Sequence, residues 1–544
     1  MIKIIGTMED LRDACKEILK AMSAGKIKDR AELARAKIEA CRKFSLTRVP
    51  RNSEILAAAG HEERKAIAGL LRLKPVRSIS GVSVITVMPR PHPCPKERPC
   101  IYCPGGPTQG TPQSYTGREP AAMRALQHNF DPYLQVRSRI EQLRAIGHEV
   151  DKVELVVFGG TITAYPEDYL EEFMLGCLNA ITGSRSGDLE EAMRTAEGSR
   201  IHISDITFET RPDWCREPHV DLMLRLGATR VELGVQALDD EIYVRIGRGH
   251  TVNDVADAMR IARDSGLAIV AHMMLNLPGS SWQRDLYMFR TLFEDERFRP
   301  DAIKIYPTLV MPNTELHGMW GRGEYSPYPL EQLVELIAEI KAMTPPWVRI
   351  QRIQRDIPAH LIAGGIRRGD LREIVRKKLR ESGRRCRCIR CREVGHVRYR
   401  EGVTPGEENI ELVERRYSAS GGEEIFLSFE DIERDIIIAL LRLRYPSQGA
   451  HRREISSERT TVVRELHVYG PLVKVGDEAG NEAWQHRGWG ERLLQEAERI
   501  SRECLDASKV AVLAGIGTRN YYRRSGYRRE GPYMTKKLVP ARAG

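Results

Sequence analysis

Six apolar stretches between residues 80 and 360 alternate with amphipathic stretches, and this alternation limits the fold more than any other feature of the chain. The apolar stretches are 82–88, 153–158, 203–209, 230–236, 267–275 and 302–308. Between most of them lie runs of helical periodicity, such as 167–181, 252–264 and 330–343. Strand–helix units in series predict a parallel sheet, either open or curved into a partial barrel. In both forms, ligands bind at the carboxyl ends of the strands.

The sequence on either side of this series belongs to other domains, because a chain of 544 residues is too long for one hydrophobic core. In residues 1–75, Lys and Arg alternate with Ala, Leu and Ile at helical spacing, which predicts a small helical domain. Residues 421–544 read as strands, a glycine turn, a helix and further strands, which predicts a second α/β domain. We therefore expect a helical segment (1–75), a barrel (76–360), a linker (361–420) and the second domain (421–544).

Charge and hydropathy limit the partners and the compartment. Lys and Arg number 85 against 75 for Asp and Glu, and the net charge of +10 favours a polyanionic partner. The basic face of residues 1–75 is either a solvated surface or an RNA-binding surface. No apolar run reaches the roughly 18 to 20 residues of a membrane span, and residues 1–20 carry charges where a signal peptide is apolar. We expect a cytoplasmic protein with no membrane partner.

Six of the eleven cysteines form two tight groups, as is typical of metal sites in a reducing compartment. Cys94, Cys100 and Cys103 lie after the first predicted strand, on a loop rich in proline and glycine. Three thiolates on one loop can hold a 4Fe-4S cluster and leave one iron open for S-adenosylmethionine. A zinc knuckle or a set of redox thiols is the alternative, and the position after the first strand favours the cluster.

Glycine and polar residues follow or end several of the predicted strands. The candidates among them are Gly159, Gly160, Thr161, Glu209, Gln236 and Lys304. The glycine pair can bring backbone N–H groups against the methionine moiety of S-adenosylmethionine, because no Cβ intervenes, although a simple turn is the alternative. The other side chains can form structural ion pairs, but their shared position at strand ends favours ligand contact. Lys304 is also a catalytic candidate.

The second cysteine group, Cys386, Cys388 and Cys391, lies in a stretch dense in arginine and glycine. Structural zinc takes four ligands, so these three thiolates and one further group would complete a site. His396 is a candidate for the fourth ligand, which the sequence leaves undetermined. Incidental thiols are the alternative.

A glycine turn at residues 485–490 (Gln-His-Arg-Gly-Trp-Gly) precedes an amphipathic helical pattern. Backbone amides at such a helix start can hold a pyrophosphate. Farther along, Tyr521 and Tyr522 can protonate a leaving thiolate, and Glu465 or His467 on the preceding strand can act as a base or position water. Aromatic core packing is the alternative for the two tyrosines.

Together these motifs resemble the catalytic subunit of Elongator in its archaeal or bacterial form, a radical S-adenosylmethionine enzyme fused to a GNAT-type acetyltransferase domain. The similar segments are 90–95, 100–106, 113–117, 209–213, 248–252, 304–310, 354–358, 464–470 and 519–522. Eukaryotic members have a longer first gap in the cluster motif, and many lack the second cysteine group. The resemblance implies an α/β protein: a partial (βα)6 radical-SAM barrel followed by a GNAT-type α/β domain, after a small basic helical segment.

What the resemblance implies about function is conversion of the wobble uridine of certain tRNAs to 5-carboxymethyluridine. A 5′-deoxyadenosyl radical would take hydrogen from the acetyl group of acetyl-CoA, the carbon radical would add to uridine C5, and thioester hydrolysis would release CoA. The basic segment 1–75 would then hold the anticodon loop. The residues that the resemblance assigns to acetyl-CoA are Lys152, Glu465, Leu466, His467, Val468, Gly488, Trp489, Gly490, Glu491 and Tyr522.

Two other functions are alternatives. A protein lysine acetyltransferase could carry the radical-SAM-like domain only as a scaffold, since GNAT folds serve many acceptors. A tRNA-binding protein could lack turnover altogether. The intact first cysteine group and the glycine pair speak against the first alternative, and the two tyrosines and the glycine turn speak against the second. Self-association is left open.

Overall fold

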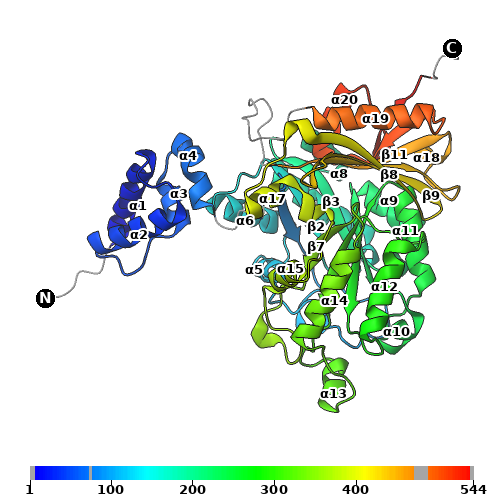
Figure 1. Ribbon diagram of the computed structural model, residues 1–544, viewed down its shortest axis with the longest axis horizontal. Helices are drawn as coiled ribbons and strands as arrows, with labels where there is room; N and C mark the ends of the chain where they lie inside the picture. Colours follow the sequence, from blue (N-terminus) through cyan, green and yellow to red (C-terminus); the bar gives the residue numbers. More distant parts are fainter. Residues whose placement is uncertain (1–6, 73–75, 77, 471–487, 540–544) are drawn as a thin grey trace.

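The computed structural model describes residues 7–72, 76, 78–470 and 488–539. Figure 1 shows four N-terminal helices beside a larger body that contains two sheets. These helices are α1 (Met8–Ser23), α2 (Arg30–Lys43), α3 (Asn52–Ala58) and α4 (His61–Leu71). Apolar side chains such as Ile18, Leu33 and Ile55 give them a core of their own. They meet the larger body where Arg72 Nε donates a hydrogen bond to the Gly147 carbonyl over 3.1 Å.

The first sheet has seven parallel strands that lie side by side in chain order, which confirms the predicted partial barrel. The strands are β1 (Ser83–Val87), β2 (Lys152–Val157), β3 (His202–Thr210), β4 (Arg230–Gln236), β5 (Ala268–Leu275), β6 (Ala302–Pro307) and β7 (Arg349–Ile353). Among the described residues β1 and β7 do not pair with each other, so the barrel is open on one side. The seventh strand was not predicted, because its charged side chains interrupt the apolar pattern.

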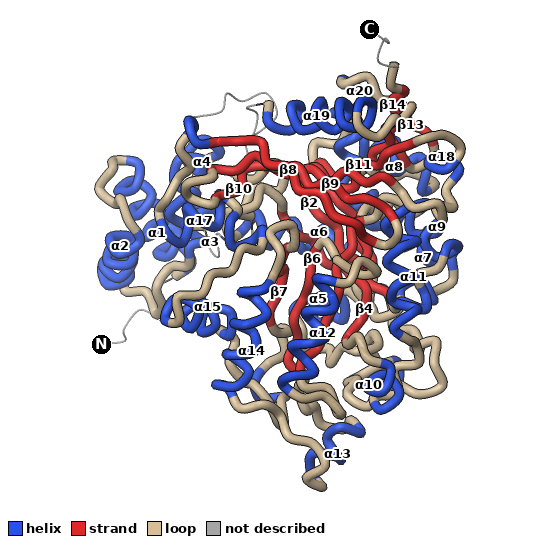
Figure 2. The backbone as a smooth tube through the Cα atoms, turned by 45° about the vertical axis from the view of Figure 1, so that its right-hand side comes forward, coloured by secondary structure: helices blue, strands red, loops and turns tan. Residues whose placement is uncertain are grey.

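The helices between these strands are α5 (Pro120–Gln127), α6 (Pro132–Ala145), α7 (Glu167–Thr182), α8 (Leu189–Glu197), α9 (Glu217–Arg225), α10 (Asp240–Arg245), α11 (Val252–Asp264), α12 (Trp282–Glu294), α13 (Glu315–Gly321) and α14 (Leu330–Met343). Most of them cover the outer face of the curved sheet, whereas α13 protrudes at the bottom of the view (Figure 2). The strands and most of these helices form the largest core, and the buried residues of α5 and α13 belong to two smaller clusters. None of the helices in the described part of the chain is long and apolar enough to cross a bilayer.

Three helices connect the first sheet to the second: α15 (Leu371–Glu381), α16 (Ile389–Arg392) and α17 (Val394–Glu401). The second sheet has the order β13-β14-β12-β11-β10-β9-β8, and only β11 and β12 pair in parallel. Its elements are β8 (Ile410–Ala419), β9 (Gly422–Asp431), β10 (Ile436–Tyr445), α18 (Arg453–Ser456), β11 (Thr460–Val468), α19 (Trp489–Glu503), β12 (Lys509–Val512), α20 (Arg519–Arg524), β13 (Arg528–Glu530) and β14 (Tyr533–Lys537). Strand β8 lies in the stretch that the sequence interpretation gave to the linker, because this edge strand is mostly polar and solvent-exposed.

The second sheet packs against the amino ends of the barrel strands. Arg464 of β11 pairs over 2.7 Å with Asp301, which immediately precedes β6. Arg444 of β10 pairs over 2.6 Å with Asp264 at the end of α11. All four side chains are buried. The carboxyl ends of the barrel strands, where ligands bind in such folds, therefore face away from the second sheet.

Candidate functional site

A cavity of about 560 Å³ opens at the carboxyl ends of the barrel strands. Its wall includes Glu209 on β3, Gln236 at the end of β4 and Tyr306 on β6. The wall also includes Cys100 and Cys103, from the loop between β1 and α5. The structure thus brings part of the first cysteine group together with two of the predicted strand-end residues.

Cationic side chains contact the sulfur atoms of Cys94 and Cys100. Arg211 Nη1 lies 3.8 Å from the Cys94 sulfur. Lys96 Nζ lies 3.3 Å and Arg248 Nη1 lies 3.7 Å from the Cys100 sulfur. Burial raises the pKa of the Cys100 thiol, but the positive charges of Arg248 and Lys96 outweigh burial and hold this pKa below its usual value. The lowered pKa favours the thiolate form of Cys100, which is the form that binds metal.

Cys103 differs from Cys100 because its polar neighbours are uncharged. Its sulfur lies 3.0 Å from Ser114 Oγ and 3.2 Å from Gln113 Nε2, and burial raises its pKa. Among the described residues, the sulfur atoms of this loop do not all lie within 4.8 Å of one another. A 4Fe-4S cluster binds each thiolate at a different iron, so its sulfur ligands need not converge on one point as they would around a single ion.

The carboxylate of Glu209 connects the cavity to the predicted glycine pair. Its Oε2 atom accepts hydrogen bonds from the Gly159 and Gly160 amides over 3.4 and 3.3 Å, and from the Tyr115 hydroxyl over 2.9 Å. Gly160 has a φ of 85°, which favours glycine at this position. Thr161 is buried directly after the pair. The pair and Thr161 therefore lie behind Glu209 and outside the cavity wall.

Lys304 lies behind the cavity wall in a buried cluster of charged groups. Its ammonium forms an ion pair with Glu232 of β4. The same carboxylate oxygen lies 2.6 Å from His272 Nε2, and His272 itself lines the cavity. Burial raises the pKa of Glu232, but Lys304 and His272 lower it to about 2. The structure thus places the predicted catalytic lysine in contact with Glu232, behind His272 and outside the cavity wall.

A second candidate site lies where β11 and β12 separate. β11 pairs with β12 only at residues 460–463. Beyond Val463, the edge of β11 that faced β12 has no strand beside it in the described structure, and this part of β11 contains the predicted residues Leu466, His467 and Val468. Helix α19 starts beside this edge with Trp489, Gly490 and Glu491, after Gly488 at its N-cap. A Cβ atom on Gly490 would lie 3.1 Å from Tyr521 Oη and 3.5 Å from Val468 Cγ2. The predicted residues Gln485, His486 and Arg487 lie outside the described residues.

The two adjacent tyrosines have different surroundings. The buried hydroxyl of Tyr521 has no hydrogen-bond partner among the described residues, and burial raises its pKa to about 12. Tyr522 is buried between aromatic rings, with ring centroids 5.1 Å from Tyr521 and 5.9 Å from Tyr527. The Tyr521 hydroxyl is therefore available to a ligand, and the Tyr522 ring packs between its two aromatic neighbours.

Glu465, His467 and Lys152 gather where the amino end of β2 meets β11. Glu465 Oε2 accepts from Arg442 Nε of β10 over 2.8 Å, and its Oε1 lies 3.8 Å from Arg230 of β4, so the carboxylate is paired within the second sheet and with the first. His467 Nε2 lies 3.2 Å from the Ser80 carbonyl. Burial and nearby Lys152 lower the pKa of His467 to about 4, so its imidazole is neutral at pH 7. Burial also lowers the pKa of Lys152.

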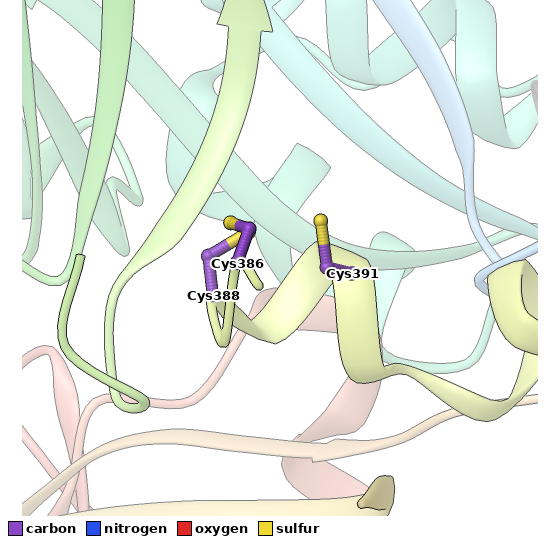
Figure 3. Close-up of side chains that lie close together, drawn as sticks. All are labelled: Cys386, Cys388 and Cys391. Atoms are coloured by element: carbon purple, nitrogen blue, oxygen red, sulfur yellow. The ribbon is translucent and has the colours of Figure 1, made fainter. Parts of the chain in front are cut away.

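The second cysteine group forms a compact trio (Figure 3). The sulfur atoms of Cys386, Cys388 and Cys391 all lie within 4.8 Å of one another, which fits three corners of a tetrahedral zinc site. His396 is not part of this group. The neighbouring polar group is Lys341 of α14, whose Nζ lies 3.4 Å from the Cys386 sulfur and 3.7 Å from the Cys391 sulfur.

Four residues of the first site were not candidates from the sequence: Lys96, Glu232, Arg248 and His272. Glu232 had a usable signal, because a carboxylate inside a buried apolar strand needs a partner. Lys96 and Arg248 had none, since 152 residues separate them and only the fold brings both to one sulfur atom.

Three family models match the chain. The ELP3 N-terminal domain matches residues 11–79, the Radical SAM superfamily matches residues 94–290, and the Radical_SAM C-terminal domain matches residues 300–381. Together they cover the N-terminal helices and the barrel. The superfamily match implies a 4Fe-4S cluster and S-adenosylmethionine.

Relatives match over nearly the full length. The chain is 48% identical to the tRNA uridine(34) acetyltransferase of Methanocaldococcus infernus, over 97% of this chain and 99% of that protein. It is 44% identical to the Elongator complex protein 3 of Homo sapiens, over 98% and 97% of the two chains. The solved structure of the archaeal Methanocaldococcus infernus Elp3 with an N-terminal deletion (1–46) is 45% identical and superimposes with a TM-score of 0.75, covering 84% of this chain and 100% of that one.

Proposed function

The chain belongs to the Elongator complex protein 3 (Elp3) family, and we propose from this premise that it is a transferase that modifies the wobble uridine of tRNA. The reaction uses acetyl-CoA and forms 5-carboxymethyluridine. Support comes from the name of an archaeal relative, tRNA uridine(34) acetyltransferase, which is similar over 97% of this chain. Further support is the presence of two separate candidate sites, which we assign to radical formation and to an acetyl-CoA molecule.

The observation that carries the proposal is the course of the 560 Å³ cavity. From the cysteine loop it follows the open side of the barrel, past Thr86 and Val84 of β1, to Arg390 on α16. Its wall contains several arginines, namely Arg124, Arg139, Arg248, Arg352, Arg355 and Arg390. Arginines attract nucleic-acid phosphates, and a cavity of this size suits one nucleotide turned out of a single-stranded loop.

In this proposal Cys94, Cys100 and Cys103 hold the 4Fe-4S cluster, and Glu209 and Gln236 contact S-adenosylmethionine. The Gly159 and Gly160 amides hold the Glu209 carboxylate in place. When bound, the cluster and S-adenosylmethionine would supply a 5′-deoxyadenosyl radical able to remove a hydrogen atom from the acetyl methyl group, which gives 5′-deoxyadenosine. In the product the methyl carbon is bonded to uridine C5 in place of the C5 hydrogen, which leaves as a proton while one electron returns to the oxidised cluster. The arginines along the cavity hold the tRNA backbone so that the uracil ring stays at the carboxyl ends of the strands.

At the second site, the amides at the start of α19 hold the pyrophosphate of acetyl-CoA, and the free edge of β11 pairs with its extended pantetheine arm. Tyr521 donates a proton to the CoA thiolate when thioester hydrolysis releases it. The cysteine trio at residues 386–391 holds a structural zinc ion. The N-terminal helices bind the anticodon arm through their basic face.

The test is mass spectrometry of nucleosides from tRNA incubated anaerobically with reconstituted protein, reductant, S-adenosylmethionine and acetyl-CoA. We expect 5-carboxymethyluridine and 5′-deoxyadenosine together. Cys100→Ser should abolish both products and leave the Kd for tRNA within about twofold, because it removes a cluster ligand and keeps every arginine of the cavity wall. Cys504→Ser, which changes an exposed cysteine, is the matched control and should keep full activity.

Full uridine modification by Cys100→Ser would refute the radical route. A cluster-loaded protein that binds tRNA, leaves uridine unmodified and acetylates lysines in a protein would instead establish the protein acetyltransferase alternative.

A further inference from the structure

Two sequence segments, 209–213 and 247–250, meet at the first cysteine loop. At the end of β3, Asp213 holds the Arg211 guanidinium through two bonds of 2.9 and 2.6 Å. After α10, the Gly247 carbonyl accepts a hydrogen bond from the Lys96 ammonium, and Arg248 Nη2 donates to the Gly234 carbonyl of β4. Each of the three cations therefore has a second hydrogen-bond partner that fixes its position beside a cysteine.

These fixed cations are distributed unevenly over the three cysteines. Lys96 and Arg248 both point at the Cys100 sulfur, over 3.3 and 3.7 Å, and Arg211 points at the Cys94 sulfur over 3.8 Å. Arg211 and Arg248 are buried, so solvent screens their charges little.

We propose that Lys96, Arg211 and Arg248 are positioning residues that raise the reduction potential of the cluster held by this loop. Each adds a positive charge and an N–H donor beside a ligand sulfur, and both features favour the form of the cluster that carries one more electron. Reduction of the cluster must precede cleavage of S-adenosylmethionine, so these residues set how easily the reaction starts. The inference rests on the cluster that the superfamily match implies and is independent of the substrate.

The experiment compares midpoint potentials of reconstituted full-length variants, without tRNA or acetyl-CoA. Dithionite supplies the electron, and electron paramagnetic resonance follows the reduced cluster across a series of fixed potentials. We expect Lys96→Gln to lower the midpoint potential, with about a tenfold loss in the reduction equilibrium, which equals about 59 mV for one electron. Lys96→Arg, which keeps the charge, should restore the value of the parent protein.

Arg98→Gln is the matched control, because Arg98 is an exposed cation on the same loop and has no contact with a cysteine sulfur in the described structure. It should keep the midpoint potential of the parent. Arg248→Gln should also lower the midpoint potential. Arg248 is buried, so this variant can fail to fold, and the test then rests on Lys96→Gln, because Lys96 is only half-buried. Equal potentials for Lys96→Gln and Arg98→Gln, even with less iron bound to the former, would overturn the proposal and leave Lys96 as a contact that only holds the loop.

Discussion

At the scale of the single residue, the barrel interior is notable for charged groups where a purely apolar core would be expected. Glu232, Lys304 and His272 are all buried on neighbouring strands, and the Glu232 carboxylate contacts the other two side chains. A buried charge is tolerated only when it is paired, because its removal from water costs several kcal/mol. The wall of the cavity at His272 is thus supported from behind by an ion pair.

We predict that Glu232→Gln lowers stability by about 3 to 5 kcal/mol at pH 7, because it leaves the Lys304 charge buried without a carboxylate. The pKa of Glu232 is about 2 in the folded state and about 4.3 when unfolded. Its contribution is therefore complete above pH 4.3 and is lost as the pH falls toward 2. Thermal unfolding measured across this pH range should show that the difference in Tm between Glu232→Gln and the parent protein disappears at low pH.

Glu324→Gln is the control for that series, because Glu324 pairs with Arg322 on the surface. Its Tm should match the parent at pH 7, since exposed pairs contribute little. If the two variants had the same Tm, the buried Glu232 pair would contribute no more to stability than an exposed pair.

At the scale of the element, the short helix α16 and the loop before it are organised around sulfur. Cys386 and Cys388 lie on the loop and Cys391 lies on the helix (Figure 3). Two of the three sulfur atoms contact the ammonium of Lys341 on α14. The trio lies between β7 of the barrel and β8 of the second sheet in the chain. A metal ion bound here would fix the connection between the two sheets.

We predict that the purified protein carries one zinc ion per chain and that Cys388→Ser loses it. A structural zinc site has four ligands, and the three thiolates supply most of them. Loss of the metal should lower the Tm and increase cleavage by proteases between residues 381 and 410, since metal binding contributes directly to folding.

Elemental analysis of the purified protein gives the zinc content. Cys504→Ser removes an exposed cysteine away from the trio and should keep both the zinc and the Tm. Retention of zinc by Cys388→Ser would contradict the assignment.

At the scale of the whole molecule, the two candidate sites lie at opposite ends of the barrel strands. The cysteine loop is at the carboxyl ends, and Lys152, His467 and the start of α19 are at the amino ends. Buried ion pairs such as Arg464 with Asp301 join the sheets, so we expect the sheets to move as one body. The open side of the barrel, along which the cavity runs, is then the route we expect between the two sites.

The N-terminal helices add a basic surface to this body. Arg35 of α2 is exposed and forms no ion pair with other residues in the described part of the chain, whereas Lys43 on the same helix is paired with Glu17 over 2.5 Å. We predict that Arg35→Glu weakens tRNA binding and reduces the slope of log K against log salt by about 0.7 for each lost phosphate contact. Filter binding at several salt concentrations measures both quantities.

Arg290→Glu, an equal charge reversal on the exposed face of α12, should leave that slope unchanged. Equal slopes for Arg35→Glu, Arg290→Glu and the parent protein would show that α2 does not contact the tRNA backbone.

The sequence by itself determined the order of the elements, six of the seven barrel strands and both cysteine groups, because these depend on local apolar periodicity and on spacing along the chain. Strands β7 and β8 escaped prediction since charged side chains hide their pattern. Only the tertiary structure decided that Lys304 pairs with Glu232, that Arg248 and Lys96 meet at Cys100, and that His396 stands apart from the cysteine trio. These contacts depend on strand register and on packing between distant segments, which local sequence patterns do not encode.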